Sequence, residues 1–380
     1  MVEGIRQGRS FVVASLLCAA ALLCGCRRGA PREGATVEIR EGVRIVRNPI
    51  DPVPALAPPA LVEDLIVGAG EEEGEPILFQ GIPYGNSVDV DSSGNIYVAD
   101  AAANRIVVID PGGALIRTLG REGQGPGDFQ APSALRVLAD GRLAVYDRTN
   151  RRLSFFDLDG RLSGERSLAA HPALFTPQID SRGDIFGLEM SRNGPVRTMT
   201  LLKITSDGAA STRIAGAARR LPLDGSLNLF TTRFDFRLTP DDGVVWGDQQ
   251  DYVLHILDRE ERPRTVIMKA YAPLAVTDAD IEAELARLGI RRAEEEKVTA
   301  PDRFPPFNLL VVADDGRVFV RVRERTAQGV KYAYDVFDGQ GFYLFRMRFP
   351  GTPVLIKAGR LYALEEGEDG AILVKRYLMK

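Results

Sequence analysis

The feature that most constrains how this chain can fold is an internal repeat with a spacing of 47 residues. Residues 94–113 read GNIYVADAAANRIVVIDPGG, and residues 141–160 read GRLAVYDRTNRRLSFFDLDG. At this one offset Asp100 corresponds to Asp147, and Arg105 corresponds to Arg152. Short alternating apolar runs bounded by Asp, Asn and Gly are typical of strand–turn–strand units. We therefore expect a fold built from repeated antiparallel units.

Weaker copies of this unit continue to the end of the chain. In each copy a glycine stands at the expected turn between the first and second strands, where tight turns often need a positive φ. The six glycines are Gly94, Gly141, Gly183, Gly243, Gly316 and Gly359. Six four-stranded units of roughly 40–50 residues predict an all-β, six-bladed β-propeller.

The two ends of the propeller region (61–380) indicate how the ring closes. The last unit supplies three strands, at Val354–Lys357, Arg360–Leu364 and Ile372–Leu378. We expect Leu61–Val67 to add the missing outer strand, which would cover an open sheet edge. Residues 36–60 are expected to run along the outside or to form a small hairpin.

One segment, at about 273–305, interrupts the repeat between blades four and five. Thr277 and Asp280 form a capping-box pattern, and Ile281, Leu285 and Leu288 follow at helical spacing. The segment therefore predicts a helical insertion. It would either pack on the side or rim of the propeller or form a partial lid over the central channel.

The first residues are typical of an export signal. Arg6 and Arg9 precede an apolar run over 11–24 that is too short to span a bilayer. The following Leu23–Cys26 segment resembles the bacterial lipobox, which implies that 1–25 is a lipoprotein signal peptide and that Cys26 carries the lipid. Residues 26–60 would then be a lipidated tether and N-terminal extension, and the protein would lie on the periplasmic or outer-membrane side. An ordinary signal peptide is the alternative.

Composition excludes several kinds of chemistry. All three cysteines lie within the first 26 residues, so a disulfide, a thiol nucleophile or a thiolate metal site is not expected in the propeller. Two histidines are too few for a three-histidine zinc site. The formal net charge of -4, without a dense basic stripe, argues against nucleic acid as a partner. We expect a monomer.

Two motifs carry a resemblance to a known family. Asn95–Asp100, followed by Asn104, Arg105 and Asp110, resembles the NHL repeat. The loop Gly120–Phe129 (GREGQGPGDF) is similar to a signature of bacterial six-bladed β-propeller lipoproteins related to NHL-repeat proteins. The resemblance is specific over 80–160 and weaker elsewhere. It implies the fold and an extracytoplasmic setting, but it does not imply a reaction.

The loops that gather on one face around a propeller's channel are the default place for a ligand. We expect Asp100 and Asp147 to hydrogen-bond turn backbone, because they recur with the repeat. The loop Gly123–Gly127 lacks the ending of a phosphate-binding loop and is expected to be a structural turn. His171 is the one candidate for an acid–base histidine. The ligand-binding candidates are Arg121, Phe129, Arg148, Arg151, His171, Phe230, Asp248, Asp251 and Arg303.

Two functions fit these observations. The first is a membrane-anchored recognition module for a protein, peptide or glycan, with no cofactor and no catalytic residue assigned. The second is a lactonase- or lyase-type propeller enzyme with a divalent cation, such as calcium, held by carboxylate and amide oxygens at the channel. The missing nucleophile and zinc patterns favour the recognition module.

Overall fold

The structure is a computed structural model that describes residues 34–52, 56–70, 76–83, 85–220, 226–290 and 298–380. The predicted signal peptide, Cys26 and part of the predicted insertion lie outside these ranges. No helix in the described ranges is long and apolar enough to cross a membrane.

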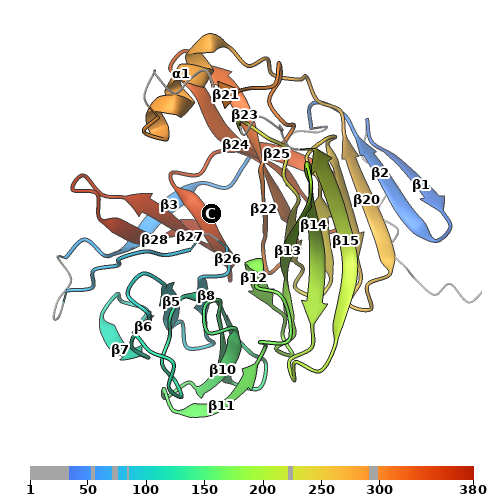
Figure 1. Cartoon of the computed structure of the whole chain (residues 1–380). Coiled ribbons are helices and arrows are strands. Elements are labelled where there is room, and N and C mark those ends of the chain that lie inside the picture. The colour runs from blue at the N-terminus through green and yellow to red at the C-terminus, as the bar shows by residue number, and fades with distance from the viewer. Residues whose placement is uncertain (1–33, 53–55, 71–75, 84, 221–225, 291–297) are drawn as a thin grey trace, which may run out of the picture. The chain divides into compact units, whose positions relative to one another are not determined.

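The described chain folds into six blades of four antiparallel strands each, and the sheet of one blade carries two additional strands (Figure 1). Alternating apolar residues form each strand, and Asp/Gly turns join neighbouring strands. Blade 1 contains β4 (Val88–Val90), β5 (Ile96–Asp100), β6 (Arg105–Ile109) and β7 (Leu115–Leu119). Blade 2 contains β8 (Pro132–Val137), β9 (Arg142–Asp147), β10 (Arg152–Asp157) and β11 (Leu162–Ser167). Blade 3 contains β12 (Phe175–Ile179), β13 (Ile185–Asn193), β14 (Val196–Ile204) and β15 (Ser211–Arg220).

The second half of the chain repeats this plan. Blade 4 contains β17 (Asp235–Leu238), β18 (Val244–Gly247), β19 (Val253–Leu257) and β20 (Pro263–Lys269). Blade 5 contains β22 (Leu309–Val312), β23 (Val318–Thr326), β24 (Gly329–Phe337) and β25 (Tyr343–Met347). Blade 6 contains β26 (Thr352–Lys357), β27 (Arg360–Glu366), β28 (Ile372–Met379) and β3 (Leu61–Val67). The predicted six-bladed β-propeller is confirmed.

The turns between first and second strands explain the repeated glycines. Five of the six glycines have a positive φ, between 70° and 89°. Gly243 is the exception, because the preceding Asp242 takes the left-handed conformation instead, at φ 60°. Glycine adopts this conformation without a steric cost, which is why it marks this turn in five of the blades.

The ring is closed by the segment predicted for that role. Strand β3 pairs antiparallel with β28, with Leu61 opposite Met379 and Val67 opposite Val374. Backbone hydrogen bonds between Ala60 and Lys380 extend this pairing. The last blade therefore combines strands from both ends of the described chain, which covers the edge of β28.

The N-terminal extension forms the hairpin that was one of its two expected structures. Strands β1 (Thr36–Arg40) and β2 (Val43–Asn48) pair antiparallel, and β2 pairs parallel with β20, which widens the sheet of blade 4 to six strands. Asn48 is buried, and its side chain donates to Gly341 O and accepts from Tyr343 N. The hairpin therefore connects blade 4 to blade 5.

The hydrophobic core is divided among the contacts between neighbouring blades. Six clusters of buried side chains, one for each neighbouring pair around the ring, together account for the packing. The cluster between blades 6 and 1, for example, combines Tyr362 and Val374 with Ile96 and Val107. Burial of apolar surface between blades is thus what holds the ring together.

Polar side chains of the inner strands add hydrogen bonds from blade to blade. Asp89 of β4 accepts from Val137 N at 2.9 Å, and Asp235 of β17 accepts from Leu310 N at 2.7 Å. Lys357 of β26 donates to Asp89 at 2.7 Å, which joins blade 6 to blade 1. These groups are satisfied within the ring, so their first role is structural.

The predicted helical insertion is present as α1 (Asp278–Arg287), which follows blade 4. Thr277 and Asp280 form the capping box, and Leu285 is the buried residue of the helix. Arg325 of β23 donates to both carboxylate oxygens of Asp280, at 3.1 and 2.7 Å. The helix therefore packs beside blade 5 (Figure 1), as in the first of the two expected arrangements.

Candidate functional site

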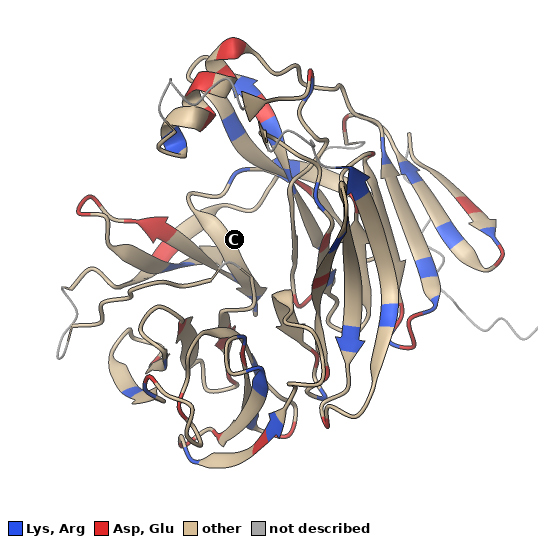
Figure 2. Ribbon diagram, in the orientation of Figure 1, with Lys and Arg blue, Asp and Glu red and all other residues tan. Residues whose placement is uncertain are grey.

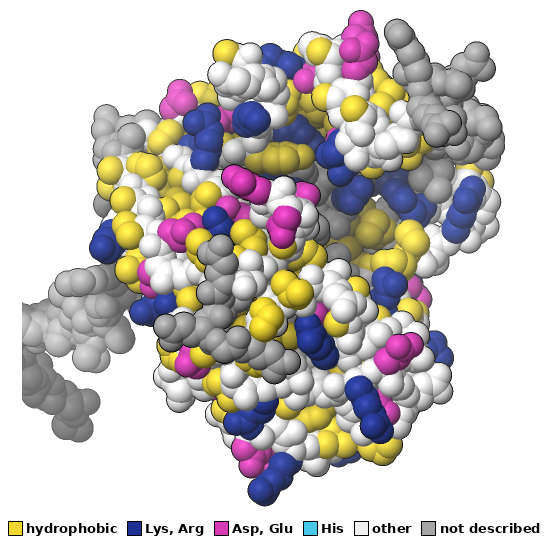
Figure 3. All heavy atoms as spheres, turned by 90° about the vertical axis from the view of Figure 1, so that its left-hand side faces the viewer, with side chains coloured by type: hydrophobic (Ala, Val, Ile, Leu, Met, Phe, Trp, Pro, Cys, Tyr) yellow, Lys and Arg dark blue, Asp and Glu magenta, His cyan; other side chains and the backbone are white. Residues whose placement is uncertain are grey.

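Two hollows are lined by residues of strands, of loops that join blades and of loops between second and third strands. Figure 3 looks onto a hollowed face where dark-blue Lys and Arg side chains gather around the depressions. The hollows lie on either side of blade 5, and their linings differ in charge.

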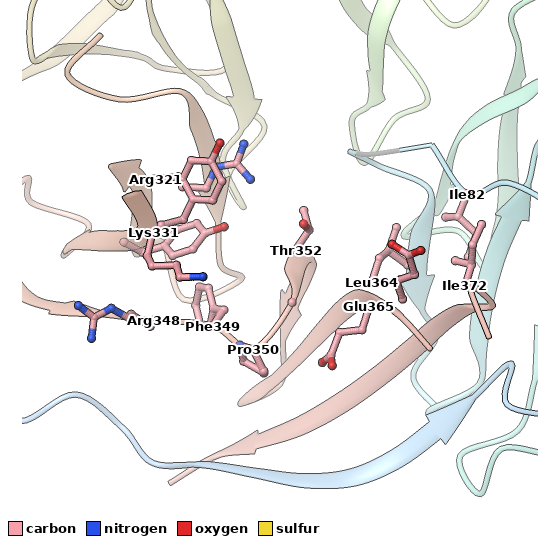
Figure 4. A pocket seen from close by; sticks show the side chains of 15 residues that line it. Ile82, Arg321, Lys331, Arg348, Phe349, Pro350, Thr352, Leu364, Glu365 and Ile372 are labelled. Atoms are coloured by element: carbon pink, nitrogen blue, oxygen red, sulfur yellow. The ribbon is translucent and has the colours of Figure 1, made fainter. Parts of the chain in front are cut away.

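The larger hollow, of about 670 Å³, lies between blades 5 and 6 and is called the large hollow. Arg321, Lys331 and Arg348 line one side, and Leu364 and Glu365 line the other (Figure 4). Two of these charges are paired: Arg348 donates to Glu324 at 2.5 Å, and Glu365 lies 3.3 Å from Lys375. The large hollow is therefore of mixed charge, with Tyr332 and Phe349 among its aromatic residues.

The second hollow, of about 490 Å³, lies between blades 3, 4 and 5 and is called the basic hollow. Its polar lining contains four arginines and two glutamines, and no carboxylate is among the lining residues that the structure describes. Figure 2 shows the basic tip of β15, which ends in Arg219 and Arg220. The lining consists of Arg197, Arg219, Arg220, Asn228, Phe230, Thr231, Thr232, Gln249, Gln250, Tyr271, Pro273, Pro301, Arg303, Phe304, Pro305 and Pro306.

Only one of these arginines has an internal counter-charge in the described residues. Arg219 contacts the Asp248 carboxylate at 3.2 Å and also donates to Asp248 O and Thr232 Oγ1. Arg197, Arg220 and Arg303 make no side-chain hydrogen bond or ion pair to any residue that the structure describes. Among its described residues, the lining of the basic hollow therefore has an excess of positive charge.

An additional arginine lies behind the aromatic wall of the basic hollow. The Arg323 guanidinium carbon lies 4.8 Å from the ring centroid of Phe304 and 5.7 Å from those of Phe230 and Tyr332. Burial lowers the pKa of Arg323. Its Nη1 has no hydrogen-bond partner in the described part of the chain. Tyr332 also lines the large hollow, so the rings of Phe230, Phe304 and Tyr332 stand between the two hollows.

The structure brings three of the sequence candidates together. Phe230 and Arg303 line the basic hollow, and Asp248 holds Arg219 in its wall. Sequence reasoning missed Arg197 and Arg219. The arginine pair at 219–220 could have been noticed in the sequence. The repeat, however, did not show that the start of β14 and the end of β15 lie at this hollow.

One candidate needs correction. Phe129 is completely buried and packs between blades 1 and 2, with its ring 5.9 Å from that of Phe156. It therefore cannot reach a ligand on the surface. The ring fills the space beside Gly120, where an added Cβ would lie 2.2 Å from it.

The other candidates line neither hollow. Arg121 and Asp251 are exposed, and Arg121 pairs with Asp128 at 3.0 Å. Arg148 is exposed and lies 5.8 Å from the Phe175 ring centroid. Arg151 donates to His171 O at 3.2 Å, and His171 Nε2 lies 2.8 Å from Gly208 O. These contacts give Arg151 and His171 a role in holding loops.

The repeated aspartates hydrogen-bond the backbone as predicted. Asp100 accepts from the N–H groups of Gln80 and Gly81, at 3.0 and 2.9 Å. Asp147 accepts from Gln130 N at 2.7 Å. The repeated Arg105 and Arg152 donate to carbonyls of the loop that enters their own blade.

Neither hollow contains an obvious metal site. Among the described residues, no group of three or more His, Cys, Asp or Glu side chains is placed to hold a metal ion. The metal-dependent alternative therefore gains no support from these side chains, although backbone and amide oxygens are further possible ligands for hard cations.

The fold defines the chain as a six-bladed β-propeller protein, and comparisons with known proteins agree. Residues 86–194 match the model of a family described as "6-bladed beta-propeller". NHL repeat-containing protein 3 of Mus musculus is 36% identical over 73 residues, which is 18% of this chain and 21% of the mouse protein. The match thus spans about a fifth of the mouse protein, and the predicted resemblance to NHL-related propellers is confirmed.

Two solved structures share the fold over nearly their whole length. One is a protein of Bacteroides fragilis described as exported, with a TM-score of 0.52, 9% identity and coverage of 88% of this chain and 99% of that protein. The other is a protein of Bacteroides vulgatus, with a TM-score of 0.50, 10% identity and coverage of 85% and 99%. At such identities these likenesses show the fold alone.

Proposed function

We propose that this protein is an extracytoplasmic recognition module, held at the membrane by a lipid on Cys26, that binds an extended peptide segment of a protein partner. The observation that carries this proposal is the lining of the basic hollow, where unpaired arginines stand beside phenylalanine and proline side chains. Such a lining combines apolar contact with a few oriented polar groups, as ligand sites commonly do.

The aromatic geometry favours a peptide over a glycan. Phe230 and Phe304 meet edge to face, with their ring centroids 4.7 Å apart, and Phe304 is buried. Phe304 is buried and Phe230 is only partly exposed, so neither ring of this pair offers an open face on which a sugar could stack. Apolar and acidic side chains of an extended peptide would find both kinds of contact in this hollow.

The two hollows are close enough in the fold to serve one ligand. Tyr332 lines the large hollow and is 47% exposed, while Arg323 beside it contacts the aromatic wall of the basic hollow. An extended segment that crosses Tyr332 would contact both. This arrangement supports recognition of several consecutive residues.

A peptide-display library and a glycan array, both applied to the purified protein, test this proposal. We expect acidic peptides to be enriched, and Tyr332→Ser to weaken their binding at least about fivefold, because an exposed aromatic contact is lost. Phe175→Ser is the matched control, since Phe175 is also an exposed aromatic beside an arginine but lines neither hollow. Enrichment of glycans only, or of no ligand at all, would overturn the proposal.

The membrane anchor is tested separately. Lipidation predicts that the protein incorporates labelled fatty acid and sediments with membranes. Cys26→Ser should abolish both, because membrane attachment depends on the acyl chains. Equal incorporation in the Cys26→Ser protein would contradict the anchor without affecting the peptide proposal.

A further inference from the structure

Buried hydrogen-bond donors without partners gather at the basic hollow. Gln249 lines it and is 1% exposed. Its Oε1 accepts from Arg233 N at 2.9 Å, which fixes the orientation of the amide. The Nε2 group consequently lies on the other side of the amide, and it has no partner among the described residues.

Two arginines add donors of the same kind. Arg197 lines the basic hollow, and its Nε is buried without a partner in the described chain. Arg323 Nη1, beside the Phe230 and Phe304 rings, is also buried without a partner in the described chain. Buried polar groups are satisfied in the great majority of native structures, so unsatisfied donors at one place indicate a missing acceptor.

The chain itself supplies no such acceptor within its described residues. Asp248 already accepts from Arg219 and from Gln250 N. Glu284, which acts electrostatically on Arg323, already accepts from Arg287. The exposed Arg220 and Arg303 add two more positive charges to the lining. Groups that are all donors, with an excess of positive charge, suit an anion with several oxygen atoms.

We propose that the basic hollow binds an oxyanion group, a carboxylate or a phosphate, carried by its peptide ligand. Gln249 Nε2 and Arg197 Nε would donate to its oxygens, and Arg220 and Arg303 would attract it electrostatically. This inference rests on the proposed function, because the anion belongs to the recognised peptide.

The size of the basic hollow fits a larger ligand that carries the anion. Its volume of about 490 Å³ lies within the range of sites for drug-sized molecules. One anion would occupy only part of it. The remaining wall, formed by Phe230 and the prolines, would contact the apolar part of the ligand.

Isothermal titration of the purified protein at low ionic strength tests this inference. The two probes are inorganic phosphate and a terminally blocked pentaglutamate peptide. The decisive variant is Gln249→Glu, which keeps an oxygen for Arg233 N while it replaces the free donor with a negative charge. We expect it to weaken binding at least about tenfold, since removing one partner of a buried charged hydrogen bond acts strongly on affinity.

Two further variants guard against misfolding and general charge effects. Arg303→Gln changes an exposed residue, so the fold should persist, and we expect binding to weaken about threefold or more. Arg161→Ala removes an arginine that is 82% exposed and outside both hollows, and it should bind within about twofold of the unchanged protein. Melting temperatures of all variants confirm folding.

The outcomes separate the possible sources of the anion. Saturable binding of pentaglutamate supports a carboxylate ligand, and saturable binding of phosphate supports a phosphorylated one. Failure of both probes to saturate at about 10 mM, or equal affinity in Gln249→Glu, would overturn the inference. If Gln249→Glu still bound the enriched library peptides, only the anion inference would fail. If phosphate bound but no peptide were enriched, only the proposed function would fail.

Discussion

A buried charge cluster between blades 4 and 5 allows a quantitative test of how the ring is held together. Asp335 of β24 is completely buried and accepts from Tyr252 Oη at 2.7 Å, Tyr343 Oη at 2.9 Å and Arg346 Nε at 2.7 Å. Lys269 Nζ lies 3.6 Å from the same carboxylate, and the Lys269 side chain is 1% exposed. We predict that Asp335→Asn strongly destabilises the protein, because it leaves a buried ammonium group without its counter-charge.

The magnitude follows from the cost of breaking a buried ion pair. Removing one partner of such a pair costs about 3–5 kcal/mol. Burial lowers the pKa of Lys269 although the Asp335 carboxylate lies beside it. The desolvation of the ammonium group is therefore substantial, and Asp335 offsets part of it. An unfolding entropy of about 2.1 cal/mol/K per residue, applied to the compact unit Arg32–Lys380, gives about 0.7 kcal/mol/K. The melting temperature should therefore fall by about 4–7 °C.

Thermal melting and urea denaturation, followed by circular dichroism, measure this loss. Asp140→Asn is the matched control, because Asp140 also pairs with an arginine but its side chain is 51% exposed. An exposed pair contributes little, so this variant should change stability by less than about 0.5 kcal/mol.

A double variant tests the cause as well as the size of the effect. Asp335→Asn combined with Lys269→Met removes both charges, and we expect it to recover much of the lost stability, because no uncompensated ammonium remains. If Asp335→Asn stayed within about 1 kcal/mol of the unchanged protein, the buried-charge reasoning would be refuted. The same holds if Lys269→Met gave no recovery.

Three further predictions concern a turn, the helix cap and a histidine. Gly120→Ala should cost about 2–4 kcal/mol, because Gly120 has a φ of 75° and an added Cβ would overlap a buried aromatic ring. Gly141→Ala, at a φ of 82° with open space around it, should cost only about 1–2 kcal/mol in the same denaturation assay. Asp280 has its pKa lowered to about 2 by hydrogen bonds from an arginine, so its contribution to stability is present above pH 3.8 and lost as the pH falls towards 2. Asp280→Asn should therefore speed amide exchange in α1 at pH 7, and unchanged exchange would contradict this role of the cap. Burial lowers the pKa of His255, which stacks on Trp246 with a centroid distance of 4.2 Å, so stability should decline as the pH falls below 6.5. The fluorescence of Trp246, the one tryptophan in the sequence, should then change at a pH below 6.5, and a midpoint above 6.5 would disprove the assignment.

The fold was predictable because the repeat carries its own structural signals. Aspartate, glycine and arginine recur at one offset, and Asp100 and Asp147 indeed accept hydrogen bonds from the loop that enters their blade. The closing strand Leu61–Val67 was predictable because a blade with three strands leaves an unpaired edge. Each of these features depends on local backbone hydrogen bonding, which short sequence patterns record.

The candidate site was less predictable because its parts come from distant segments. Arg197 and Gln249 both line the basic hollow, although 52 residues separate them in the sequence. Nothing in the sequence around Phe129 distinguishes an exposed loop aromatic from a buried one, and the structure shows that its ring packs against Gly120. Burial of a single loop side chain depends on tertiary packing, which periodicity does not record.

The site lies where the chain departs from its repeat. Strands β14, β15, β23 and β24 contain 9 or 10 residues, compared with 5 in β5 and β6 of blade 1. Arg197 lies near the start of β14, and Arg219 and Arg220 end β15, so these arginines belong to the additional length. A repeat unit satisfies its own polar groups, as Asp100 and Arg105 do in blade 1. The additional residues of these strands have no counterpart in the repeat that would satisfy their polar groups. These polar groups lie at the ends of blades 3, 4 and 5, where a ligand can satisfy them. In this propeller, the candidate site therefore coincides with the divergence from the repeat and not with the repeat itself.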